Sequence, residues 1–219
     1  MSELSPTIPH LAQAAAQRFG DAAAILEAGE TWSYQQLWDK VRQAASAMLK
    51  AGITRGDRVA IWAPNRKEWI VAAIASQLAG AAVVPLNTRL KGREAGEILR
   101  RTSAKMLFMV DAFLGTDYPA LIKNEDLPAL KHTILFDKDW AAFLAEGDLS
   151  DDAVDAALAQ CTADDVSDIM FTSGTTGIPK GVLTTHGRIL PMFDNWTKLV
   201  DLRRGDTYLI INPFFHSFG

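Results

Sequence analysis

Hydrophobic positions along the first 136 residues follow two alternating spacings. Four short apolar runs are typical of buried strands: Arg58–Trp62, Ala82–Leu86, Met106–Val110 and His132–Phe136. Segments with helical spacing lie between them, at residues 65–80, 93–101 and 118–124. This alternation predicts an α/β fold with a largely parallel sheet and helices on both faces. In such folds, ligands bind beyond the carboxyl ends of the strands.

The N-terminal residues carry signals for smaller elements. A helix is expected between Pro9 and Gly20, followed by a hairpin whose strands span residues 22–26 and 31–34. Ser33 and Gln36 form a capping box for a helix that ends at Gly52. By the same reasoning, Asn65 with Glu68 is expected to cap the next helix.

The second half of the chain predicts a surface crossing and then further strands. Residues 137–168 are rich in Ala and Asp and have weak helical periodicity, which suggests a surface crossing. Strands are expected at residues 168–171, 182–185 and 208–211.

Composition narrows the class of protein. The chain has 219 residues, of which 48% are hydrophobic and 22% charged, enough for a buried core. Its net charge of −4 comes from interspersed acidic and basic residues, so a nucleic-acid partner is not expected. Cys161 is the only cysteine, which fits a reducing, cytoplasmic location. We expect neither a secretory signal nor a membrane span.

The segment FTSGTTGIPKG, from Phe171 to Gly181, has the composition of an anion-binding loop. Glycines let backbone N–H groups converge on an anion, and hydroxyl groups add further donors. Lys180 supplies a compact positive charge, and Pro179 fixes the exit of the loop. The residues suited to phosphate binding are Thr172, Ser173, Gly174, Thr175, Thr176, Gly177 and Lys180.

Other nucleotide and nucleophile motifs do not fit this segment. A Walker A loop requires a Gly-Lys pair, which the sequence lacks, and the GxGxxG fingerprint is also missing. Ser173 has no glycine two residues before it, so it is not a nucleophile elbow. On composition alone, a simple surface turn remains an alternative.

Four segments in order resemble the adenylate-forming superfamily, which includes acyl-CoA synthetases: TWSYQQL, LAGAAVVPLNTRL, TSGTTGIPKG and NPFFHSFG. The resemblance covers the whole chain. It implies that ATP, Mg²⁺ and coenzyme A take part, and that a carboxylic acid is activated as an acyl-adenylate before transfer to a thiol. It also implies that the loop residues named above bind the β- and γ-phosphates of ATP. LAGAAVVPLNTRL itself is interpreted as a helix end, a turn and a strand rather than as part of a site.

The PFFHSFG segment resembles the histidine element of acyl-CoA synthetases, which places His216 near the acyl carboxylate and the thiol. His10, His132 and His186 are expected at ordinary surface or helix-terminal positions, and Trp62 and Trp69 in the core.

The family's later elements, including its Mg²⁺-associated pair, its ribose-binding Asp and its catalytic Lys, are not found in this sequence. Residues 1–219 are therefore expected to be an incomplete N-terminal portion of the adenylation domain, without the C-terminal domain. Neither catalytic residues nor a metal site is expected in this portion, and alone it should be inactive.

The form of the histidine element favours an acyl-CoA ligase as the whole enzyme. VVPLNTR and INPFFHSFG resemble bacterial ligases that activate ring-bearing propanoates from steroid breakdown. Two alternatives remain: adenylation for loading a carrier protein, and a non-catalytic nucleotide-binding module.

Overall fold

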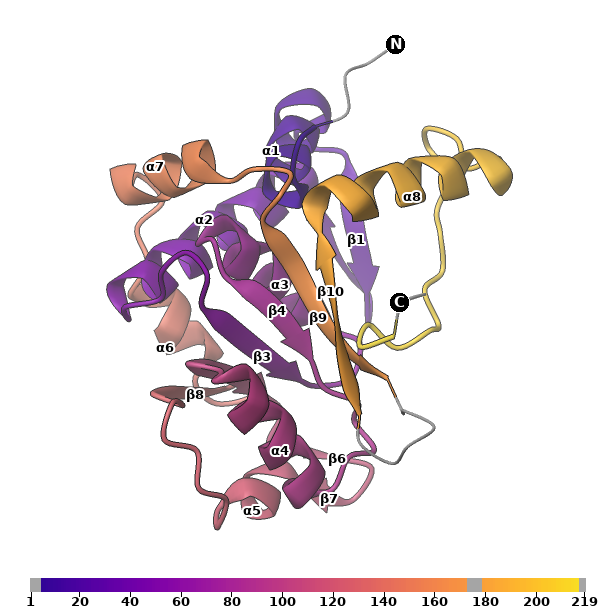
Figure 1. Cartoon of the computed structure of the whole chain (residues 1–219). Coiled ribbons are helices and arrows are strands. Elements are labelled where there is room, and N and C mark those ends of the chain that lie inside the picture. The colour runs from indigo at the N-terminus through magenta and orange to yellow at the C-terminus, as the bar shows by residue number, and fades with distance from the viewer. Residues whose placement is uncertain (1–4, 173–178, 217–219) are drawn as a thin grey trace.

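A computed structural model describes residues 5–172 and 179–216 (Figure 1). Its centre is a six-stranded sheet in the order β10-β9-β4-β3-β5-β8. Neighbouring strands are parallel except β10, which pairs antiparallel with β9. The strands of this sheet are β3 (Arg58–Trp62), β4 (Ala82–Pro85), β5 (Met106–Met109), β8 (His132–Leu135), β9 (Val166–Thr172) and β10 (Lys180–Thr185).

Helices cover both faces of this sheet. From β3 the chain moves to one side through α3 (Lys67–Leu78), and from β4 it returns past β3 to β5 through α4 (Gly92–Thr102). Right-handed crossovers in opposite directions place these two helices on opposite faces. Figure 1 shows α4 grouped with α5 (Tyr118–Ile122), away from α1 (Ile8–Phe19) and α2 (Tyr34–Lys50). The predicted α/β fold is confirmed.

The remaining elements are shorter or lie at the ends of the chain. They are β1 (Ala23–Glu27), β2 (Glu30–Ser33), β6 (Ala112–Phe113), β7 (Thr116–Asp117), α6 (Trp140–Ala145), α7 (Asp152–Gln160) and α8 (His186–Leu199). β1 and β2 form the expected hairpin, and Ser33 and Gln36 make both bonds of the expected capping box. No helix in the described part of the chain has the length and apolar character needed to cross a membrane.

The core lies where the strands are buried on both faces. Every residue of β4 and β5 is buried, as expected for central strands of a parallel sheet. An aromatic cluster formed by Phe108, Phe136, Trp140 and Phe143 packs at the β8 side, with ring centroids 5.3–5.9 Å apart. This core gives the carboxyl ends of β3, β4 and β5 a fixed geometry.

Two sequence predictions about elements are wrong. The N-cap of α3 is Arg66, which makes no side-chain cap bond, and Asn65 instead binds the backbone of residues 212–214. Tyr208–Ile211 do not form a strand, because no strand of the described part of the chain pairs with them. Leu209 and Ile211 are 78% and 80% exposed. An apolar run becomes a strand only where its backbone groups find partners.

His186 is a partial exception to the prediction for the histidines. It lies at a helix end, as expected, since it is the first residue of α8, but only 1% of it is exposed. Its Nδ1 accepts a hydrogen bond from the backbone N–H of Ile8 at 3.3 Å. Burial lowers the pKa of His186 to about 4; nearby Asp165 opposes this shift, and His10 adds to it. The imidazole is therefore neutral when the protein is folded at neutral pH.

We expect His186 to make the folded chain sensitive to mild acid. The pKa falls from its ordinary 6.5 to about 4 on folding, so between these values the unfolded chain binds more protons. Stability should fall as pH decreases through this range, by about 3 kcal/mol at most from this residue. Urea unfolding at several pH values, with His186→Asn compared with the unsubstituted chain, measures the effect. A variant that loses the same stability between pH 7 and pH 4.5 would contradict this assignment.

Candidate active site

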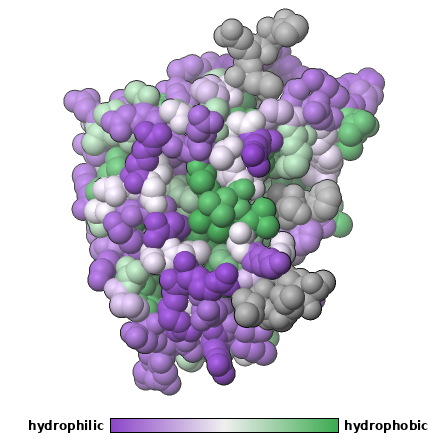
Figure 2. Space-filling view, in the orientation of Figure 1, coloured by the Kyte–Doolittle hydropathy of each residue, from purple (hydrophilic) through white to green (hydrophobic). Residues whose placement is uncertain are grey.

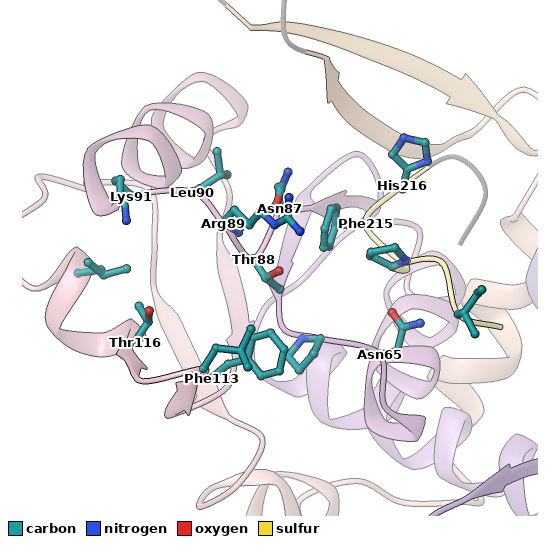
Figure 3. Close-up of a pocket in the computed structure, with 15 residues that line it drawn as sticks. Asn65, Asn87, Thr88, Arg89, Leu90, Lys91, Phe113, Thr116, Phe215 and His216 are labelled. Carbon is teal, nitrogen blue, oxygen red and sulfur yellow. Dashed lines mark hydrogen bonds between the residues drawn. The ribbon is translucent and has the colours of Figure 1, made fainter.

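A cleft of about 820 Å³ opens at the carboxyl ends of β3 and β4 (Figure 3). Its polar lining comes from the segments that follow these strands, from β7 and from the C-terminal segment. These residues are Asn65, Asn87, Thr88, Arg89, Lys91, Thr116 and His216. The cleft also has an apolar part, which includes Phe113 and Phe215.

The topology explains why the cleft lies here. The chain runs from β3 to β4 on one side and then returns to β5 on the other side of β3. The connections after these strands therefore diverge and leave a crevice at the carboxyl edge of the sheet. The cleft lies in the region that the strand alternation predicted for a ligand.

Two buried aromatic residues hold the loop between β4 and α4. Trp62 Nε1 donates to the carbonyl oxygen of Asn87 at 3.0 Å, and the Tyr118 hydroxyl donates to that of Thr88 at 2.8 Å. The two rings meet edge to face, 4.5 Å apart. Burial raises the pKa of Tyr118, so its phenol stays protonated and remains a donor at neutral pH. The backbone beneath Arg89 is thereby fixed from inside the core.

The cleft carries positive charge. Arg89 and Lys91 are both exposed in its lining, and none of the residues that line it is acidic. The N–H of Arg89 donates to Asn87 Oδ1 at 2.9 Å, which shapes the turn before Lys91. The Glu94 carboxylate accepts from the Lys91 N–H at 2.7 Å but is not part of the lining. A lining that contains cations and no acidic residue favours an anionic ligand.

An ion-pair network stabilises the loop after β3. Arg66 bonds Glu68 and Asp137, each at 2.8 Å, and lies over the ring of Phe136. Burial alone would raise the pKa of Asp137, but the bonds from Arg66 and from the Asp111 N–H outweigh it, and that pKa is lowered. Asp137 therefore stays ionised and joins the ends of β3, β5 and β8.

The two described ends of the predicted phosphate loop face each other. Thr172, the last residue of β9, pairs with Lys180, the first residue of β10, and both are exposed. Paired residues of an antiparallel ladder project from the same face. Ser173, Gly174, Thr175, Thr176 and Gly177 lie outside the described residues.

Arg101, on α4, contacts both sides of this loop. Its Nη1 donates to the Pro179 carbonyl oxygen at 2.6 Å, and its guanidinium lies over the ring of Phe171, 5.3 Å from the centroid. A Cβ atom at Gly181, which pairs with Phe171, would lie 3.2 Å from that ring, closer than most Cβ contacts in proteins. Arg101 has no local signal in the sequence, because its partners lie about 70 to 80 positions further along the chain.

His216 and Phe215 both belong to the lining of the cleft, together with Asn87 and Asn65 (Figure 3). Its backbone N–H donates to the Pro213 carbonyl oxygen at 2.9 Å, which forms a turn. The sequence singled out His216 but missed Asn65, Arg89, Lys91 and Thr116. The available signal was the position of polar residues directly after the buried strands β3 and β4.

This architecture is that of the N-terminal part of an adenylate-forming ligase. The N-terminal domain of FACL13 from Mycobacterium tuberculosis has a similar structure, with a TM-score of 0.85 and 29% identity over 96% of this chain and 52% of that one. A fatty acyl CoA synthetase from the same organism gives a TM-score of 0.84 at 27% identity, over 96% of this chain and 40% of that one.

The chain belongs to the AMP-binding enzyme family, which it matches over residues 12–219. It is 42% identical to the 3-(7a-methyl-1,5-dioxo-octahydro-1H-inden-4-yl)propanoyl:CoA ligase of Mycobacterium tuberculosis, over 97% of this chain and 43% of that protein. It is 34% identical to the long-chain-fatty-acid–CoA ligase FadD13 of the same organism, over 84% of this chain and 35% of the relative. The chain thus spans less than half the length of these curated relatives.

Proposed function

We propose that the whole protein activates a carboxylic acid with ATP and then transfers the acyl group to coenzyme A. The observation that carries this proposal is the pairing of Thr172 with Lys180 at the two ends of the Gly- and Thr-rich loop, in a chain of the AMP-binding family. In the first step a carboxylate oxygen attacks the α-phosphorus of ATP and pyrophosphate leaves. In the second step the thiol of coenzyme A attacks the acyl carbon and AMP leaves.

The loop would bind the β- and γ-phosphates of ATP. Its proposed ligands are Thr172, Ser173, Gly174, Thr175, Thr176, Gly177 and Lys180. Backbone N–H groups, hydroxyls and an ammonium all stabilise the negative charge that grows on the departing pyrophosphate. No enzyme nucleophile is required, because the carboxylate of the substrate is itself the nucleophile.

The cleft would receive the acid and its thiol acceptor. Arg89 and Lys91 supply positive charge there, and His216 lies in the same lining as a donor to a carboxylate. Phe113 and Phe215 offer apolar surface beside these groups. The cleft is therefore suited to a molecule that has both an anionic group and an apolar body.

Mg²⁺ would accompany ATP. Among the described residues, no group of three or more His, Cys, Asp or Glu side chains gathers as a metal cage. In nucleotide enzymes Mg²⁺ is usually held by the substrate phosphates together with one or two carboxylates.

For the substrate, we propose a propanoate attached to a fused-ring system. The relative of Mycobacterium tuberculosis described above and a ligase of the same name from Rhodococcus jostii, 40% identical over all of this chain and 45% of that protein, both act on such a ring-bearing propanoate.

Residues 1–219 would form the N-terminal portion of the adenylation domain, with the rest of the polypeptide packed against it. Figure 2 shows a hydrophobic area at the centre of the face that carries β9 and β10 in Figure 1. In β10, Val182 and Leu183 are 49% and 59% exposed. Apolar side chains on an edge strand favour association with a further segment.

Pyrophosphate exchange tests the proposal. We expect the whole protein to exchange labelled pyrophosphate into ATP only when the carboxylic acid is present, and to form a thioester when coenzyme A is added. The 219-residue chain alone should do neither. Loading of a carrier protein without coenzyme A would instead support the carrier-loading function. Exchange at the full rate by the 219-residue chain would refute the assignment of this chain as an incomplete domain.

A further inference from the structure

Asn65 lies between the carboxyl end of β3 and the start of α3, where the cleft begins (Figure 3). It is half-buried and does not cap α3. Its side chain instead bonds a segment almost 150 positions further along the chain. The Asn65 side chain at the edge of the cleft therefore bonds the backbone of a distant segment instead of capping the start of α3.

The amide of Asn65 makes two hydrogen bonds to that segment. Nδ2 donates to the carbonyl oxygen of Asn212 at 2.8 Å, and Oδ1 accepts from the N–H of Phe214 at 2.7 Å. The bonded groups flank Pro213, which has no N–H of its own. The amide supplies both the donor and the acceptor, whereas a carboxylate cannot donate and a leucine side chain can do neither.

Two further contacts extend this link to the cleft. The ring of Phe214 packs against that of Trp69 on α3, with centroids 5.1 Å apart. The carbonyl oxygen of Pro213 accepts a hydrogen bond from the N–H of His216. Asn65 and Trp69 therefore hold the two residues that flank Pro213, whose carbonyl oxygen closes the turn to His216. The preceding residues 208–211 are exposed and belong to no strand of the described part of the chain.

We propose that Asn65 is a positioning residue, which fixes the backbone of residues 212–214 and so places Phe215 and His216 at the cleft. The effect of Asn65 on catalysis rests on the proposed function. Its effect on the position of residues 212–214 rests on the two hydrogen bonds alone.

Hydrogen exchange of the 219-residue chain tests the structural part without any ligand. In Asn65→Leu, which loses both bonds, the Phe214 amide should exchange about tenfold faster or more. Asn65→Asp keeps the acceptor and loses the donor, so a smaller increase is expected. Asn124→Asp is the matched control, because Asn124 is exposed in the segment that follows α5 and lies outside the cleft. Unchanged exchange at Phe214 in both Asn65 variants would overturn the proposal.

Kinetics of the whole protein test the catalytic part. In Asn65→Leu, kcat/KM for the carboxylic acid should fall about tenfold or more, while KM for ATP changes by less than about twofold. Faster exchange at Phe214 with unchanged kcat/KM for the acid would overturn the positioning role. If the unsubstituted whole protein shows no adenylation, the proposed function fails. Hydrogen exchange at Phe214 then still decides whether Asn65 holds residues 212–214.

Discussion

Replacing Lys180 with alanine should lower the rate of acyl-adenylate formation by the whole protein about 10²- to 10³-fold. Lys180 is the first residue of β10, and its pairing with Thr172 fixes its backbone at the mouth of the loop. Its side chain is exposed, so the ammonium is available to a polyphosphate. Its charge matters most when pyrophosphate departs, because negative charge then concentrates on the leaving oxygen.

The measurement is carboxylate-dependent exchange of pyrophosphate into ATP. Lys180→Arg should retain part of the activity, because it keeps the charge but changes the shape of the donor. Lys198→Ala is the matched control, since Lys198 is an exposed lysine on α8 whose ion pair with Asp194 adds little stability. Unfolding temperatures of the variants should agree, because neither lysine is buried. Exchange by Lys180→Ala at the unsubstituted rate would refute the role of Lys180.

The central sheet was predictable because its signals are local. Arg58–Trp62 was predicted residue for residue, and the predictions for β4, β5 and β8 each extended one residue too far. Four of five residues in β3 and all residues in β4 and β5 are buried, so each appears in the sequence as an unbroken apolar run. Strand ends depend on where the backbone pairing stops, and the side chains of one segment do not determine that.

Predictions failed where a residue's partner lies far away in the sequence. The Asn65 and Glu68 pattern fits a helix cap, yet the two bonds to residues 212–214 replace the cap. His186 has polar neighbours in the sequence but is buried beside the start of α1. In the same way, Tyr208–Ile211 has the composition of a strand, but none of the described strands pairs with it. Local pattern gives a propensity, and tertiary contacts decide the outcome.

The candidate site was predictable only in part for the same reason. The proposed phosphate loop is one continuous segment, so the sequence alone, through its resemblance to the adenylate-forming superfamily, was sufficient to propose it. The cleft combines residues after β3, after β4 and near the C-terminus, and only the fold brings these together. The residues from Asn87 to Leu90 were interpreted as ordinary structure, although the polar character of Asn87, Thr88 and Arg89 directly after a buried strand was visible.

Removal of the Trp62 side chain should produce the largest loss of stability among the substitutions considered. Trp62 is completely buried, and its indole contacts Tyr118 and donates to Asn87. Trp62→Ala is expected to lower the free energy of unfolding by about 3–5 kcal/mol, through lost apolar contact and the cavity left behind. Trp62→Phe keeps a ring but loses the N–H, so a loss of about 1–2 kcal/mol is expected beyond the change in packing.

Urea unfolding of the 219-residue chain measures these losses, and hydrogen exchange of residues 87–91 shows whether the loop is affected. Tyr118→Phe is the matched partner, since it removes only the hydroxyl bonded to Thr88 and should cost about 1 kcal/mol. Because the two bonds hold adjacent carbonyl groups, the double variant Trp62→Phe with Tyr118→Phe should deviate from additivity by about 0.5 kcal/mol or more.

A cost below about 1 kcal/mol for Trp62→Ala would show that the core reorganises around the site. If the losses in the free energy of unfolding are additive and hydrogen exchange at residues 87–91 is unchanged, Trp62 and Tyr118 stabilise the core without fixing the loop that carries Arg89.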